Sequence, residues 1–518
     1  MKFIKYIVIL FLLFPLTVNA YTKAVVDITS MSITDLKDAL DKGYLTSELL
    51  VTLYLERIDA YNSKFNAIRE INESALEEAR KLDKEREEGN VRSILHGIPI
   101  VVKTNMDVEG LATTAGAKAL SDNYPNEDAR VIQKLKDAGA IILASTNMSE
   151  FAFAASNSVS SYGTVRNAFN PSYTSYGSSG GSAVAVATSF AAASLGTDTN
   201  SSVRLPAAAA GLVGLRPSIG LISTEGVIPY DILRDTVGIL SKTVEDNAII
   251  LSIINEEEKT YSPNLDSLEG VTIGVINSYL KGEDSSIRVN SKTDLDIYNL
   301  ATKKIELLKE AGANIVYIDE LIDRYYYNIA SSTMSGDSFC DGFNDYILNT
   351  TGTIRSFRSL VNASGKIYSL NGYLGGCNRS WTYDLNTVTE KKEIFENHIL
   401  DIFKEYDLDL IVYPTTKNKV FTLSSGSSAS APGSFLGSVI GYPSLTVPMG
   451  NIDEFSYGLE FFSLKNEENL LYNVAYLFEQ KNNLDITNST LTPSLYEIPE
   501  YKKKKKKYYE QGVELKEE

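Results

Sequence analysis

The chain has 518 residues, of which 43% are hydrophobic, and its 66 acidic and 49 basic side chains give a formal net charge of −17. So acidic a chain argues against a nucleic-acid-binding protein, because phosphate backbones attract basic surfaces. No internal repeat and no linker rich in proline, glycine and serine divides it, so we expect one large domain over residues 21–490.

Residues 1–20 have the pattern of a secretory signal peptide. Lys2 and Lys5 precede a short apolar run, and small residues end the segment at Ala20. The run is interrupted by Pro15 and is too short to cross a bilayer comfortably, which disfavours a membrane anchor. We expect cleavage after Ala20 and a secreted or extracytoplasmic protein, in contact with a membrane only if the segment is retained.

The predicted elements alternate between helices and strands. Residues 33–84 have a helical pattern, and a second helix ends at Gly139. Short apolar runs rich in β-branched residues predict buried strands at residues 98–103, 140–144, 271–276, 314–319 and 408–414. This alternation predicts an α/β fold with a largely covered sheet.

The core of the domain is expected over about 91–260 and 405–480. Residues 285–400 between these parts are helical, tyrosine-rich and irregular, and we interpret them as an insertion or cap over the sheet. The charged residues 491–518, with six consecutive lysines at 502–507, are expected to form a disordered tail.

The chain has two cysteines, Cys340 and Cys377. They are too few for a disulfide framework or a C-x-x-C metal site. In an oxidising compartment they can form one disulfide, and we state that pairing as a hypothesis.

Two serine-rich clusters, residues 176–187 and 196–207, indicate serine chemistry, although the chain has only two histidines. Residues 177–181 match the G-x-S-x-G elbow of esterases, with Ser179 as the nucleophile and His398 as its late histidine. That elbow requires a strand directly before it, and the preceding residues are polar and interrupted by proline. The esterase interpretation is disfavoured and stays open.

A second template, S-x-x-K combined with S-D-N, matches residues 278–281 and 121–123 in the wrong order and without K-T-G, so we regard it as chance. A third template uses a lysine as the base. Lys103 ends an apolar strand, and burial disfavours its ammonium form, which leaves a neutral amine able to accept a proton. Taken alone, such a lysine is more commonly salt-bridged or extended toward solvent.

The complete pattern resembles the amidase signature family, whose members hydrolyse amides with a Ser–Ser–Lys triad. The resemblance is carried by "LHGIPIVVKTN", "GAIILASTNMSEFAF", "GSSGGSAVAVA", "GTDTNSSVRLPA" and "GYPSLTVPMG". It covers most of residues 30–480, with little contribution from 285–400. It implies a mixed, twisted central sheet covered by helices on both faces.

By matched position, the resemblance implies that Lys103 is the catalytic lysine, Ser178 a bridging serine after a cis peptide bond, and Ser202 the nucleophile. Protons would pass from Ser202 through Ser178 to Lys103 as the Ser202 hydroxyl attacks the amide carbonyl and forms an acyl-enzyme. Ser179 and Ser182 are expected to hold the loop and cap the helix that follows. That buried helix is expected over residues 182–195.

The resemblance also implies an oxyanion hole made of backbone N–H groups from Thr199, Asn200 and Ser201, up to the nucleophile. Asp198 and Arg204 flank this loop, and we interpret them as structural supports.

Three features depart from the family pattern. Asn200 and Ser201 replace a common Gly-Gly, Thr104 replaces an aspartate after the lysine, and Tyr176 replaces the first glycine of the serine motif. No triad member is lost, but the changes leave rate and substrate range open.

The expected function is hydrolysis of a small-molecule carboxamide to an acid plus ammonia or an amine. No metal or organic cofactor is expected, and the oligomeric state is left open. The alternatives are an inactive secreted binding protein on the same scaffold, the G-x-S-x-G esterase, and an amidotransferase component that works on charged tRNA. The signal peptide and the acidic charge disfavour the last of these.

Overall fold

The computed structural model describes residues 27–281, 293–319, 322, 324–333, 337–374, 377 and 385–494. The expected signal peptide, its cleavage site and the lysine run of the tail lie outside the described residues. Within the described part of the chain, each helix is too short or too polar to cross a bilayer.

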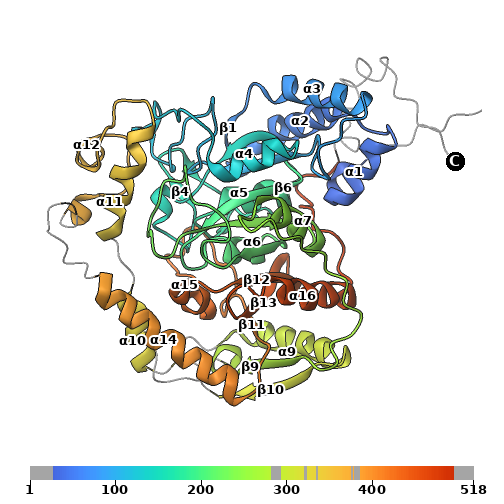
Figure 1. Ribbon diagram of the computed structural model, residues 1–518, viewed down its shortest axis with the longest axis vertical. Helices are drawn as coiled ribbons and strands as arrows, with labels where there is room; N and C mark the ends of the chain where they lie inside the picture. The colour runs from blue at the N-terminus through green and yellow to red at the C-terminus, as the bar shows by residue number, and fades with distance from the viewer. Residues whose placement is uncertain are drawn as a thin grey trace, which may run out of the picture.

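Eleven strands of the described chain form one mixed sheet that runs through the middle of the molecule (Figure 1). Their spatial order is β1-β3-β2-β6-β8-β7-β12-β13-β11-β9-β10. The strands are β1 (Ile68–Ile71), β2 (Pro99–Lys103), β3 (Ile141–Thr146), β6 (Ala193–Asp198), β7 (Val213–Arg216), β8 (Thr236–Ser241), β9 (Thr272–Ile276), β10 (Asn314–Ile318), β11 (Leu410–Pro414), β12 (Ser444–Ile452) and β13 (Phe455–Ser463). β2 runs parallel to β3 and β6, whereas β6, β8, β7, β12 and β13 pair successively antiparallel. The expected mixed central sheet is confirmed. A separate hairpin joins β4 (Val159–Ser160) and β5 (Gly163–Thr164).

Helices flank the sheet. They are α1 (Ile33–Asp41), α2 (Ser47–Phe65), α3 (Ala75–Glu87), α4 (Arg130–Asp137), α5 (Gly180–Ala187), α6 (Arg204–Ala209), α7 (Val244–Ile254), α8 (Asn277–Lys281), α9 (Leu295–Glu310), α10 (Arg324–Ser332), α11 (Asp337–Tyr346), α12 (Phe357–Asn362), α14 (Leu385–Glu405), α15 (Leu436–Ile440) and α16 (Glu468–Asn482). α10 packs against α14 and α11 against α12, along one side of the molecule (Figure 1). Cys340 on α11 forms a disulfide with Cys377, as the sequence hypothesis proposed.

The central strands are buried on both faces. Every residue of β2, β3 and β6 is buried, which matches their nearly continuous apolar sequences. α5 packs against β2 and β6, and α6 packs against β7, β12 and β13. The serine clusters at the starts of α5 and α6 therefore lie in the middle of the fold.

The helical pattern expected over residues 33–84 is confirmed for α1, α2 and α3, but it missed the turn after α1 and the strand β1. Gly43 adopts a positive φ after α1, and Thr46 caps α2 by accepting a hydrogen bond from the N–H of Leu49. α2 ends at Phe65, the next residue Asn66 has a left-handed backbone, and β1 follows and pairs antiparallel with β3. Sheet pairing across some 75 residues overrides the local helical pattern here.

The helix expected over residues 182–195 ends earlier in the structure than the sequence predicted. α5 ends at Ala187, where the Thr188 hydroxyl donates to the carbonyl of Val184 and Ser189 takes a positive φ of 53°. The alanine-rich residues from Ala193 onward form β6 instead. Within residues 285–400, the strand expected at 314–319 is β10, the edge strand of the main sheet, and α9 packs against β11 and β12.

Candidate active site

Lys103 is the last residue of β2 and is fully buried. Its Nζ lies 2.7 Å from the Ser178 Oγ, 2.9 Å from the Ser179 Oγ and 2.7 Å from the Thr197 Oγ1. Burial lowers the pKa of Lys103 to about 7, although the charges of Asp235 and Asp198 oppose the shift. Near neutral pH the side chain is therefore available as a proton acceptor.

Ser178 follows a cis peptide bond at Gly177–Ser178, as the resemblance implied. Two hydrogen bonds hold this turn, from the N–H of Gly177 to the carbonyl of Ala155 (2.8 Å) and from the N–H of Ser149 to the carbonyl of Ser178 (3.0 Å). A Cβ on residue 177 would lie 2.6 Å from the Ala154 carbonyl oxygen, so the close approach requires glycine.

Ser202 lies in the loop between β6 and α6, and 5% of it is exposed. Its carbonyl accepts a hydrogen bond from the N–H of Ser179 (3.1 Å), which joins the two serine clusters. Among the described residues no hydrogen bond links the hydroxyls of Ser202 and Ser178. Catalytic hydrogen bonds commonly tighten only when substrate binds.

The loop before Ser202 is held by its side chains. The Thr199 hydroxyl donates to Asp235 Oδ1 (2.6 Å), and Arg234 Nη1 donates to the Asn200 amide oxygen (3.0 Å). In the part of the chain that the structure describes, no hydrogen bond occupies the N–H groups of Ser201 and Ser202. These two donors can therefore bind a developing oxyanion.

A buried ionic network supports this loop. Asp198 accepts hydrogen bonds from Arg204, Arg216 and the N–H of Val203, and Arg204 also pairs with Glu460 on β13. Burial alone would raise the pKa of Asp198, but the two guanidinium groups lower it to about 2. Asp198 and Arg204 thus lie where structural supports were expected.

Ser179 and Ser182 contact neighbouring segments. Ser179 occupies the N-cap position of α5, but its side chain makes no cap hydrogen bond, so the capping prediction is wrong for it. Its hydroxyl donates instead to the carbonyl of Thr197 (3.1 Å). The Ser182 hydroxyl donates to the carbonyl of Leu195 (3.0 Å), which holds α5 on β6.

The histidines take other positions. His398 lies on α14 and stacks on Tyr326, with ring centroids 3.5 Å apart. His96 Nε2 lies 2.9 Å from the carbonyl of Leu82, and burial lowers its pKa. Because Lys103 contacts Ser179 and neither histidine does within the described contacts, the geometry does not support the esterase.

Comparison with known proteins agrees with this geometry. A family model described as Amidase matches residues 49–471. The chain belongs to the amidase family. Amide C–N bond hydrolysis is therefore its chemistry.

Curated relatives of this amidase include two proteins named as subunits of glutamyl-tRNA(Gln) amidotransferase. The one from Salinibacter ruber is 38% identical over 322 residues, which are 59% of this chain and 60% of the relative. The one from Clostridium kluyveri is 30% identical over 485 residues, 86% of this chain and 94% of the relative. The solved structure of native peptide amidase from Stenotrophomonas maltophilia has a TM-score of 0.78 and 30% identity, over 88% of this chain and 98% of that one.

Sequence reasoning missed several residues around Lys103, Ser178 and Ser202. Thr197 alternates with Asp198 on β6, so its side chain points to the opposite face, toward Lys103, and this alternation could have identified it. Asp235 and Glu460 carried no such signal, because they come from distant parts of the chain and meet the loop only in the folded protein.

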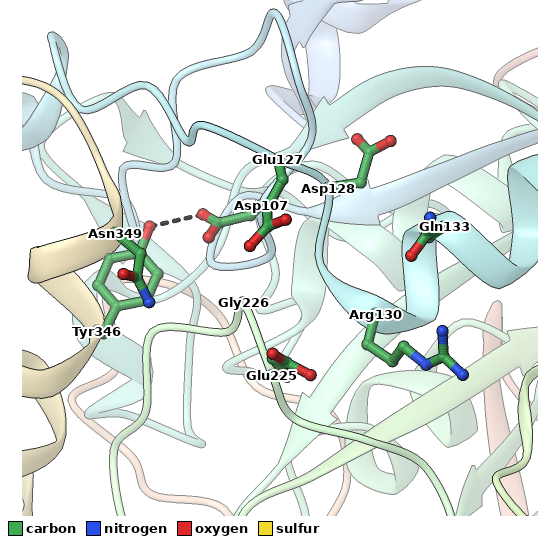
Figure 2. A pocket seen from close by; sticks show the side chains of 9 residues that line it. All are labelled: Asp107, Glu127, Asp128, Arg130, Gln133, Glu225, Gly226, Tyr346 and Asn349. Atoms are coloured by element: carbon green, nitrogen blue, oxygen red, sulfur yellow. Dashed lines mark hydrogen bonds between the residues drawn. The ribbon is translucent and has the colours of Figure 1, made fainter.

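A carboxylate-rich pocket of about 310 Å³ lies beside the segment after β2 (Figure 2). Its lining includes Asp107, Glu127 and Glu225, and Tyr346 on α11 donates to Asp107 Oδ1 (2.6 Å). Burial raises the pKa of Asp107 to about 6. None of the triad candidates lines this pocket, so we do not place amide chemistry there.

Within the described residues, no group of three or more His, Cys, Asp and Glu side chains is arranged to hold a metal ion. Metal-independent hydrolysis remains a prediction, to be checked by retention of activity after chelation with EDTA.

Proposed function

We propose that this amidase hydrolyses a terminal carboxamide through an acyl-enzyme on Ser202. The observation that carries the proposal is the contact between a fully buried Lys103 amine and the Ser178 hydroxyl at 2.7 Å. The Ser202 loop is joined to the same turn through the N–H of Ser179.

The proton relay follows from the contacts of Lys103. A neutral amine has two N–H donors and one lone pair, and its three hydroxyl neighbours lie at 2.7–2.9 Å. With Thr197 and Ser179 accepting its N–H groups, the lone pair accepts the proton of Ser178. Ser178 in turn accepts the proton of Ser202, whose Oγ attacks the amide carbon.

The tetrahedral oxyanion then binds to the N–H groups of the 199–202 loop. As the C–N bond breaks, the relay runs in reverse and protonates the departing amine, which is otherwise a poor leaving group. Water attacks the acyl-enzyme on Ser202 by the same route, which releases the acid and restores the free serine.

An active-site label tests these roles. A fluorophosphonate should modify Ser202, as located by mass spectrometry, and Lys103→Ala should abolish the labelling. Ser179→Ala is the matched control and should still be labelled on Ser202, because the proton path from Ser202 to Lys103 does not pass through Ser179. An adduct on Ser179 would support the esterase, and a folded protein with no adduct would support an inactive scaffold.

An aromatic cluster suggests what the acyl part of the substrate contacts. The ring of Phe153 has neighbours at centroid distances of 5.3 Å (Tyr230), 5.6 Å (Tyr368) and 5.2 Å (Tyr373), and all four rings are only partly buried. The Phe153 loop bonds to the turn before Ser178 through the carbonyl of Ala155.

The other end of the cluster adjoins the nucleophile loop. The N–H of Tyr230 donates to Asp235 Oδ2 (2.6 Å), and Asp235 also accepts from Thr199. We therefore propose carboxamides with an apolar or aromatic acyl part, and the likeness to peptide amidase supports amides of peptides. Amides of phenylalanine or leucine should have higher kcat/KM than those of glycine or aspartate, and Phe153→Ala should remove that preference.

We also propose that the protein works outside the cytoplasm. The N-terminal sequence and the Cys340–Cys377 disulfide support this. N-terminal sequencing of the protein from its native host should start at Tyr21, and an intact Met1 would count against export by cleavage.

A further inference from the structure

Asn200 stands immediately ahead of the N–H donors of Ser201 and Ser202 in the nucleophile loop. Its side-chain oxygen accepts a hydrogen bond from Arg234 Nη1 (3.0 Å), and its backbone carbonyl accepts one from Arg204 Nη2. Two buried guanidinium groups thus hold this single residue, one through its side chain and one through its main chain.

Arg234 also contacts the helices at the side of the molecule. Its Nη2 donates to the carbonyl of Ala330 (2.9 Å) on α10 and to the hydroxyl of Thr333 just beyond that helix. The Arg234 side chain is fully buried, and its own carbonyl accepts from Arg216 Nη2 (2.7 Å). The planar, always charged guanidinium presents its donors in a fixed geometry, which fixes the distance between its partners.

Asp235, the residue after Arg234, makes a second contact with the nucleophile loop. Asp235 accepts from the Thr199 hydroxyl, so residues 234 and 235 hold residues 200 and 199 in turn. The loop that carries Arg234 therefore lies against the oxyanion loop, and the Arg234 side chain joins that loop to α10.

We propose that Arg234 is a positioning residue for the oxyanion loop, acting through Asn200 and anchored on α10. The inference rests on the role proposed above for that loop. It gives Asn200 a specific role: its side chain is an acceptor that fixes the direction of the following N–H groups. Misplacing such donors by about 1 Å costs up to about 100-fold in rate, so the effect is expected in kcat.

A double-mutant cycle tests the proposal. Asn200→Ala and Arg234→Met should each lower kcat by about 10- to 100-fold, with little change in KM, and the double variant should be no slower than the slower single variant. Arg234→Lys should recover little, because an ammonium cannot reach Asn200 and α10 together in the same geometry. The pH at which kcat/KM is half-maximal should not move, because Lys103 is untouched.

Two further variants keep the test decisive if Arg234→Met does not fold. Thr333→Val removes one anchor of Arg234 on the α10 side and should lower kcat by a smaller factor, an effect that disappears in the Asn200→Ala background. Ser332→Ala is the matched control, because its hydroxyl donates to the carbonyl of Ile329 within α10, and it should leave kcat unchanged.

The outcomes separate this inference from the proposed function. Full activity of Asn200→Ala would overturn the positioning role, and so would a double variant whose loss in kcat equals the product of the two single losses. In either case Ser202→Ala would remain inactive, and the proposed function would stand. Full activity of Ser202→Ala in the same assay would instead overturn the proposed function.

Discussion

At the scale of single residues, we expect the environment of Lys103 to determine the pH range in which the enzyme is active. Its neighbours within hydrogen-bond distance are the neutral oxygens of Ser178, Ser179 and Thr197, and no carboxylate lies among these contacts. Burial therefore dominates and lowers the pKa of the amine to about 7.

The first prediction concerns pH. Below pH 7 the protonated Lys103 cannot accept a proton, so log kcat/KM should rise with a slope of about one up to pH 7 and then level off. Lys103→Arg should be inactive at every pH, because a guanidinium stays charged. A pH–rate profile of the purified enzyme checks both, and an optimum on the acid side would contradict the role of Lys103.

Thr197 offers a finer test. Its hydroxyl accepts from Lys103 (2.7 Å) and from the Asn105 amide (3.2 Å). A hydrogen bond to an ammonium favours the charged form, so removing this acceptor in Thr197→Val should lower the pKa of Lys103 further. The acid limb of the pH–rate profile should shift to lower pH, and a shift to higher pH would contradict the argument.

The residues of the proposed triad could be singled out from sequence because they lie in contiguous motifs of distinctive composition, at the end of β2, just before α5 and in the loop after β6. Arg234 and Asp235 could not be predicted in this way, because nothing in the sequence of residues 229–236 indicates that two side chains of this segment contact residues 199 and 200. That contact exists only once β8 is placed beside β6.

At the scale of elements, the ionic network joins pieces that are far apart in sequence. Arg204 on α6 contacts Asp198 at the end of β6 and Glu460 on β13, and Arg216 on β7 contacts the same aspartate. Charges fully removed from water are tolerated only when paired in this way. The network therefore sets the position of α6 relative to the sheet.

Breaking that network should destabilise the fold. Arg204→Met leaves Glu460 without its guanidinium, and we expect the free energy of unfolding to fall by about 3–5 kcal/mol in urea denaturation. Glu460→Gln is the milder control, because its amide oxygen still accepts from Arg204 and Tyr413. An equal loss in both variants would contradict the charge argument.

The same network has a pH signature. The pKa of Asp198, about 2 in the folded state, lies below its unfolded value near 3.9. Its stabilising contribution is therefore complete above about pH 4 and is lost as the pH falls through about 2.

Strands are easier to predict than helix limits. The apolar runs of β2, β3 and β11 stand out because both faces are covered, whereas β1 has partly exposed residues and gains its conformation from pairing with β3. The helix after Ser178 is shorter than its sequence predicts. The sequence extends the prediction too far because alanine favours helix and no proline or glycine marks the end at Ala187. The end is set by Ser189 and the sheet beyond it.

The disulfide closes a segment at the side of the molecule. Cys340 and Cys377 are 37 residues apart, with α12 between them. Closing a loop of this length lowers the conformational entropy of the unfolded chain, which stabilises the folded state by about 3–4 kcal/mol. The Cys340→Ser/Cys377→Ser variant should therefore be cleaved faster by a protease within residues 347–370, while cleavage within the main sheet should not become faster. Equal protease resistance of the variant and the unmodified protein would contradict this.

At the scale of the whole molecule, two kinds of evidence point to different working partners. The curated relatives from Salinibacter ruber and Clostridium kluyveri are named for work on glutamyl-tRNA(Gln), whereas the solved peptide amidase is named for work on peptides. The fold and the proposed triad are compatible with both, because the same amide chemistry serves either substrate. We expect the overall charge to favour a substrate other than tRNA.

The net charge of −17 disfavours the attraction of a polyanion to the chain as a whole, and the lysine run at residues 502–507 is the local exception. We therefore expect no saturable binding of tRNA in a filter-binding assay at about 0.15 M salt, where the Debye length is about 8 Å. We also expect the purified chain alone to hydrolyse peptide amides without added subunits. Binding of tRNA that weakens steeply with salt, together with activity only in a complex, would instead place this chain with the amidotransferase subunits.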